Sequence, residues 1–167
     1  HYLERFTWRH DSVLNFLAKT LQNLNECKLF VDLPGFKSPS IITGDEHRPD
    51  LLLSTPDNHL YIIELTVGFE SNLTNNVNRM QERKISKPNQ RTDRKFISVK
   101  FINLSISTLG VFDKECHTFI KMLNDLGQDK QHQQYCIRKI ISIAIRSTYY
   151  IFCCRNKEWT NPDLMIA

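Results

Sequence analysis

Two short apolar runs, separated by four turn-forming residues, constrain the fold of this chain more than any other feature. Residues 51–53 (LLL) and 60–63 (LYII) are apolar, and Thr55-Pro56-Asp57-Asn58 between them is typical of a tight turn. Runs this close pair as an antiparallel hairpin, because a parallel pair needs a crossover of a dozen or more residues. We therefore predict strands over residues 50–54 and 59–67.

The predicted hairpin carries two carboxylates. Asp50 begins its first strand and Glu64 lies inside the second. If the turn is centred on Asp57, Asp50 lies opposite Glu64 with the β-carbons roughly 5 Å apart. Two carboxylates this close ionise together only when a cation sits between them. The ion that suits an all-oxygen site is Mg²⁺ or Mn²⁺, which acidifies bound water and clamps phosphate oxygens.

A simpler interpretation of the same residues stays open. Asp50 starts a strand and has no further role, and Glu64 pairs with Arg48 or Lys28. A turn shifted by one residue also removes the site, since it places the two carboxylates on opposite faces of the sheet.

The other patterns predict a single α/β domain over residues 1–167. Apolar residues at helical spacing predict a helix over 7–25, and alternation predicts strands over 28–33 and 98–105. A polar loop runs to Asp45, a polar helix covers 72–85, and further helices cover 115–126, which Gly127 ends, and 132–152. This order predicts a helix packed on a four-stranded mixed sheet, with a core at about 7–105 and a helical C-terminal part at about 114–153.

The composition of the chain limits the binding partners and the cellular compartment that we expect. Lys and Arg outnumber Asp and Glu by 22 to 18, which permits a polyanionic partner without requiring one. Five cysteines without a CxxC pair favour a reducing compartment, nuclear or cytoplasmic. No apolar run approaches the ~20 residues of a membrane span, so no membrane partner is expected. Because the chain begins at His1, we expect a fragment of a longer protein.

The quoted motifs resemble a known superfamily. Arg48-Pro49-Asp50 followed by Glu64-Leu65-Thr66 resembles the PD-(D/E)xK nuclease signature, and the predicted element order is that of its restriction-endonuclease-like core. The chain is more similar still to the restriction-like endonuclease domain at the C-terminus of non-LTR retrotransposon polyproteins. The similar stretches are 6–14 (FTWRHDSVL), 48–51 (RPDL), 64–67 (ELTV) and 145–150 (IRSTYY), within a resemblance that covers about 6–162.

The resemblance implies a metal-dependent endonuclease that nicks double-stranded DNA to prime reverse transcription. Its partner is then the reverse transcriptase part of the same polyprotein. By position, Asp50 and Glu64 ligate Mg²⁺ (or Mn²⁺), and the Leu65 carbonyl is a third ligand. Arg48 contacts phosphate or holds Asp50. Thr66 stands where many nucleases of the superfamily have a lysine, and it supplies no charge.

The retrotransposon branch places this lysine on the next helix, in a pattern like RKxxKY. The best match is 79–84 (RMQERK), in which the two lysine positions hold Met80 and Arg83, and Lys84 replaces the aromatic residue. We expect Lys84 or Arg83 to act as the catalytic cation, although arginine cannot exchange a proton. Pro88 also interrupts the helix. The alternative is a catalytically inactive remnant of the fold that acts at most as a DNA-binding module.

A basic segment surrounds these positions. Residues 79–95 hold seven basic and two acidic residues, a net charge of +5 that suits a DNA backbone. With Arg48, the predicted DNA-binding residues are Arg79, Lys87, Arg91 and Arg94. The alternative is a solvated surface.

Two other groups have both a functional and a structural interpretation. His10 and Asp11 are candidate accessory groups, as a proton acceptor or an outer-sphere ligand, but an Asp near a helix start is more often a cap or a partner of the helix dipole. The aromatic residues near the end of the last helix suit base stacking, but we predict that they pack in the core: Tyr149, Tyr150, Phe152 and Trp159.

Overall fold

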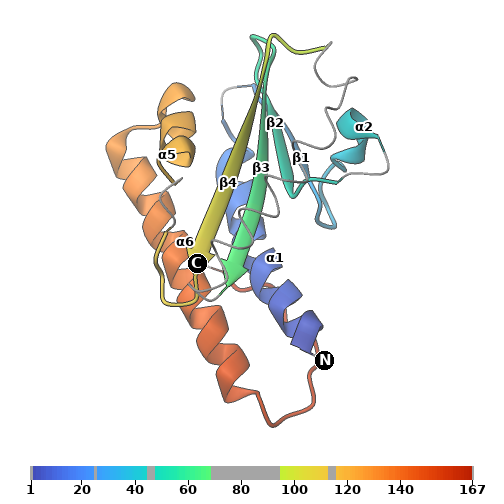
Figure 1. Cartoon of the computed structure of the whole chain (residues 1–167), viewed down its shortest axis with the longest axis vertical. Coiled ribbons are helices and arrows are strands. Elements are labelled where there is room, and N and C mark those ends of the chain that lie inside the picture. The colour runs from blue at the N-terminus through green and yellow to red at the C-terminus, as the bar shows by residue number, and fades with distance from the viewer. Residues whose placement is uncertain (1, 25, 45–47, 69–94, 113–115, 167) are drawn as a thin grey trace.

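A computed structural model describes residues 2–24, 26–44, 48–68, 95–112 and 116–166. Its four strands form one sheet in the order β1-β2-β3-β4 (Figure 1). Strands β1 (Lys28–Val31), β2 (Leu51–Ser54) and β3 (His59–Gly68) are antiparallel neighbours, whereas β4 (Ser98–Ser107) runs parallel to β3. The predicted four-stranded mixed sheet is therefore confirmed.

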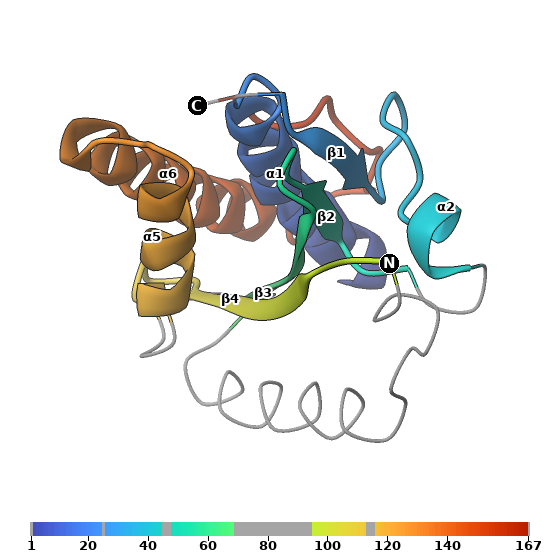
Figure 2. The same ribbon diagram turned by 90° about the horizontal axis from the view of Figure 1, so that it is seen from above.

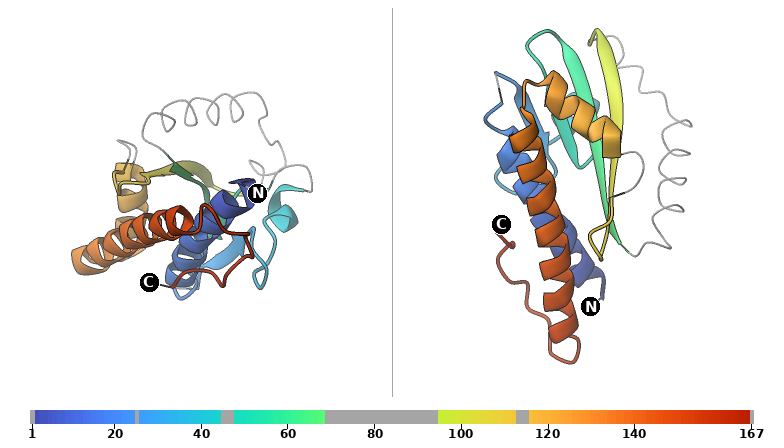
Figure 3. Two further views of the ribbon diagram at one scale, coloured as in Figure 1. Left: turned by 90° about the horizontal axis from the view of Figure 1, so that it is seen from below. Right: turned by 90° about the vertical axis from the view of Figure 1, so that its left-hand side faces the viewer.

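The helices gather on one face of this sheet. Helix α1 (Tyr2–Leu21) and helix α6 (Lys130–Cys153) lie side by side beneath the strands, as Figure 2 and the two views of Figure 3 show. Helix α5 (Cys116–Asp125) covers β4 on the same face, and the short helix α2 (Ser40–Thr43) follows β1. No helix in the described ranges is long and apolar enough to cross a membrane.

Strand alternation divides the apolar side chains between two clusters. The larger cluster takes the residues of β2, β3 and β4 that face the helices, including Leu51, Ile63 and Ile102. The opposite face of the sheet has a smaller cluster of Phe30, Leu52, Leu60 and Ile62. Because neighbouring residues of a strand point to opposite faces, the odd-numbered residues of β3 face the helices and Glu64 belongs to the other face.

The predicted helix over 7–25 is shifted. Helix α1 begins at Tyr2 and ends at Leu21. Its first turns are held by the C-terminal segment: Arg5 donates to the carbonyls of Cys154 (3.0 Å) and Lys157 (2.8 Å), and Trp8 donates to that of Asp163 (3.2 Å). These contacts join residues about 150 positions apart in sequence, so helical spacing near the N-terminus cannot indicate them.

The remaining predicted elements agree with the structure within a few residues, with three exceptions. The loop predicted up to Asp45 contains α2. The predicted helix over 72–85 lies outside the described residues. The predicted core packing of the late aromatic residues is wrong: Tyr149, Tyr150 and Phe152 are 68%, 40% and 57% exposed, and Trp159 is half-buried. Tyr150 and Trp159 instead form a ring cluster with Trp8, with centroids 5.3–6.1 Å apart.

Candidate active site

The register of the hairpin is the one predicted for a turn centred on Asp57. Leu51 pairs with Ile63 and Ser54 with Leu60, so continuing the ladder by one residue brings Asp50 opposite Glu64. This excludes the one-residue shift that would have separated the two carboxylates.

Asp50 itself ends the β2–β3 ladder through its side chain. The next partner for Leu65 in this register is Pro49, but the Leu65 amide donates instead to Asp50 Oδ2 at 2.7 Å. On the other side, the Asp32 amide donates to the Asp50 carbonyl at 3.0 Å. The carboxylate of Asp50 thus takes the place of a backbone acceptor at the end of the strand pair. Its position is fixed by two neighbouring strands, which suits a group that must hold a ligand in a defined place.

His10 approaches the same carboxylate from helix α1. Its Nε2 lies 3.4 Å from Asp50 Oδ2, and its Nδ1 lies 3.0 Å from Asp11 Oδ1. Both ring nitrogens face carboxylate oxygens, an arrangement that the doubly protonated imidazolium satisfies. Burial lowers the pKa of His10, but the hydrogen bonds and charges of Asp11 and Asp50 outweigh it and raise the pKa to about 10. His10 is therefore a cation at neutral pH rather than a proton acceptor.

The structure changes the interpretation of two predicted neighbours. Asp11 lies in the middle of α1, since the helix begins at Tyr2, so a capping role is wrong. Arg48 is exposed and pairs with Asp32 at 3.9 Å, and the cation beside Asp50 is His10. The proposed contact of Arg48 with phosphate stays a prediction.

Polar residues of β4 line up with the second carboxylate. Glu64 pairs with Asn103 and Thr66 with Ser105 in the parallel register, so these four side chains share one face of the sheet. Asn103, Thr66 and Ser105 are buried, and Ser105 Oγ has no hydrogen-bond partner among the described residues. Sequence reasoning missed Asn103 and Ser105. The signal was the polar alternation within residues 98–107, although it gains meaning only once the register with Glu64 is known.

The basic positions predicted downstream lie outside the described residues. They are Arg79, Arg83, Lys84, Lys87, Arg91 and Arg94, together with Met80. The choice between Lys84 and Arg83 as the catalytic cation therefore stays open.

The donor chemistry at this end of the sheet fits a hard divalent cation. Glu64 offers carboxylate oxygens beside the Asn103 amide and the Ser105 hydroxyl, and the Asp50 carboxylate lies at the end of the neighbouring strand, where its Oδ2 is 3.4 Å from His10 of α1. Among the described residues, no three His, Cys, Asp or Glu side chains are grouped closely enough to form a complete ligand set. Such an ion would thus need other donors, of which the Leu65 carbonyl is the predicted one.

The fold of this chain is found in a protein of known structure. No protein-family model and no curated protein matches the chain. A solved structure of a phenuiviridae cap-snatching endonuclease superposes with a TM-score of 0.53. This chain shares its fold with an endonuclease. The match covers 93% of this chain and 66% of that chain at 15% sequence identity, so it shows the fold.

Proposed function

We propose that this protein is a metal-dependent DNA endonuclease of retroelement origin that nicks double-stranded DNA by hydrolysing a phosphodiester. The observation that supports the proposal is the hairpin register, which, continued by one residue beyond Leu51 and Ile63, sets Asp50 opposite Glu64, in a chain with the fold of an endonuclease. Metal-assisted hydrolysis of a phosphodiester uses two carboxylates of this kind to hold the ion.

Each residue has a distinct part in this proposal. Asp50 and Glu64 would hold Mg²⁺ or Mn²⁺ with the Leu65 carbonyl, and the ion supplies charge neutralisation and an acidified water. The Leu65 amide orients Asp50 by its 2.7 Å hydrogen bond. His10 adds a fixed positive charge beside Asp50, which favours the approach of a phosphate.

The remaining parts come from the sequence alone. Lys84 or Arg83 would steady the phosphate, and the segment 79–95 with Arg48 would follow the DNA backbone. The resemblance to the retrotransposon domain also makes the reverse transcriptase of the same polyprotein a proposed partner, and a nuclear or cytoplasmic location is proposed with it.

The second proposed function is that of an inactive remnant that binds DNA without cutting it. The observation that favours it is Met80, which stands at a position where the family pattern has lysine. Replacing Met80→Lys distinguishes the two. Nicking that appears only in this variant indicates a decayed nuclease, while nicking by the natural sequence rejects the remnant.

A substrate panel tests the proposal. The protein is incubated with supercoiled plasmid, single-stranded DNA and capped RNA, each with Mg²⁺, with Mn²⁺ and with EDTA. We expect conversion of supercoiled plasmid to open circles in the two metals and none in EDTA. Capped RNA belongs in the panel because the structurally similar protein is a cap-snatching endonuclease. If the protein cuts the RNA and leaves the plasmid intact, the substrate is RNA and the proposed DNA substrate is wrong. If it cuts neither, the result supports the inactive remnant.

A further inference from the structure

Helix α6 exposes aromatic and aliphatic side chains along a face that no described element covers. Tyr135, Ile145, Tyr149 and Phe152 recur at intervals that keep them on one side of the helix, and each is at least 42% exposed. The opposite side of α6 packs in the larger apolar cluster, where its buried residues are Cys136, Ile140, Ile143 and Ala144. An apolar stripe that the fold does not bury indicates a contact with another molecule.

The charge of the same helix is of one sign. Its 24 residues include Lys130, Arg138, Lys139 and Arg146 and no Asp or Glu. The charges alternate with the rings, and Lys139 Nζ lies 5.6 Å from the centre of the Tyr135 ring. Basic groups that alternate with exposed aromatic rings are typical of surfaces that bind single-stranded nucleic acid, where bases stack and phosphates pair.

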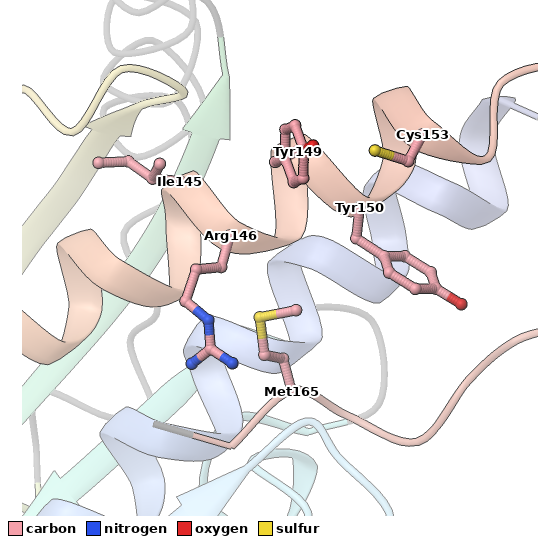
Figure 4. Close-up of a pocket in the computed structure, with 6 residues that line it drawn as sticks. All are labelled: Ile145, Arg146, Tyr149, Tyr150, Cys153 and Met165. Carbon is pink, nitrogen blue, oxygen red and sulfur yellow. The ribbon is translucent and has the colours of Figure 1, made fainter.

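A pocket of about 380 Å³ opens beside Tyr149 (Figure 4). Its walls are mostly apolar, and Arg146 lies at its edge next to Met165. The pocket is lined by Ile145, Arg146, Tyr149, Tyr150, Cys153 and Met165. The pocket offers the Tyr149 ring and the Met165 sulfur to a flat nucleobase. The guanidinium of Arg146, whose Nη1 donates to the Ile166 carbonyl at 3.3 Å, has further donors for an adjoining phosphate.

A buried arginine joins helix α6 to the C-terminal end of β3. Arg9 Nη1 donates to Thr148 Oγ1 at 3.2 Å, and Arg9 Nη2 donates to the Val67 carbonyl at 3.1 Å. Thr148 precedes Tyr149 on α6, and Val67 follows Glu64 by three residues on β3. The part of α6 that carries Tyr149 is therefore tied to the C-terminal end of β3, the strand that carries Glu64.

We infer that this face of α6, defined by Tyr135, Arg138, Ile145, Arg146 and Tyr149, binds the single strand that leaves the nick. The inference deepens the proposed nuclease function and rests on it. A protein partner is the competing occupant, because Leu109 and Val111 beside α6 are also exposed. The absence of acidic residues from all 24 positions of α6 and the aromatic pocket with its arginine favour the nucleic acid.

The test is fluorescence anisotropy with a labelled 15-nucleotide oligothymidylate, in EDTA, so that binding is read without catalysis. Tyr149→Leu keeps an apolar side chain but removes the ring, and we expect affinity to fall by about fivefold or more. Tyr149→Phe keeps the ring and should bind within twofold of the natural protein. Arg146→Gln should reduce the slope of log K against log salt by about 0.7, as expected for one lost phosphate contact on a single strand. Lys28→Gln, which removes an exposed charge on β1, is the matched control and should leave both readouts nearly unchanged.

Two results would overturn the inference. One is equal affinity for Tyr149→Leu and the natural protein. The other is a dimer, measured by light scattering after gel filtration, that Tyr149→Leu dissociates, since the face would then join copies of this chain. Plasmid nicking is measured separately. If ring-dependent binding is lost while nicking is retained, this surface is rejected and the nuclease function stands. If ring-dependent binding occurs without nicking, the nuclease function is rejected, and the face binds single strands without a nick as their source.

Discussion

Replacing His10→Gln removes the one charge that both Asp11 and Asp50 share. A rise in the pKa of His10 from 6.5 to about 10 corresponds to at most about 5 kcal/mol of pH-dependent stability. The imidazole and its partners are 19–29% exposed, so solvent screens part of this energy. We expect a loss of about 2 kcal/mol in the free energy of unfolding at pH 6, the size of one hydrogen-bonded charge.

The pH dependence follows from the direction of the shift. The folded state binds the proton more tightly than the unfolded chain, so the contribution of His10 is complete below about pH 6.5. It declines as the pH rises further and is absent above about pH 10. Urea unfolding at pH 6, 8 and 10.5, in EDTA, measures the difference between the natural protein and His10→Gln, and that difference should shrink to near zero.

The matched control is His132→Gln. His132 also lies beside a carboxylate, Asp129 at 3.1 Å, but both side chains are about 70% exposed. A surface pair of this kind contributes little to stability, because solvent screens its charges. A difference for His10→Gln that stays constant from pH 6 to 10.5, or that is no larger than that of His132→Gln, would show that the pair with Asp50 does not form in solution.

Two further predictions concern stability and thiol reactivity. Gly110→Ala should lower the free energy of unfolding by about 2 kcal/mol or more in urea titrations, because Gly110 has φ +84 and an added Cβ would lie 2.8 Å from Ile141. Gly35→Ala is the control: Gly35 has φ +90 but open space around it, so the loss should be only about 1 kcal/mol. Equal losses for the two variants would contradict the packing at Gly110. Iodoacetamide should modify the exposed Cys153 but not Cys136 in the folded protein, because burial raises the pKa of the Cys136 thiol to about 12. Early alkylation of Cys136, detected by mass spectrometry, would contradict its burial.

Local patterns were sufficient for the hairpin. The turn residues and the two apolar runs that flank them predict the observed register, and this register, continued by one residue, sets Asp50 opposite Glu64. Local patterns did not predict the contact of His10 with Asp50. Its position on α1 relative to Asp50 depends on how that helix packs on the sheet, which no spacing within 7–25 reveals.

The exposure of Tyr149 and Phe152 was also not predictable from local patterns. Both are aromatic residues of the kind that fill cores, and helical spacing alone does not show which side of α6 faces the sheet. The buried stripe of α6 is set by contacts with α1 and β4, and the aromatic residues that it leaves outside are the basis of the proposed single-strand surface.

The most direct measurement of the central claim compares plasmid nicking by the natural protein and by Asp50→Asn across a Mn²⁺ titration. The amide keeps the size of the side chain and one oxygen for the Leu65 amide, but it loses the charge that a cation requires. We predict metal-dependent nicking by the natural protein and a loss of at least about a hundredfold in Asp50→Asn, with urea unfolding showing that the variant still folds. Nicking at an equal rate by a folded Asp50→Asn would contradict the assignment of Asp50 to the metal site.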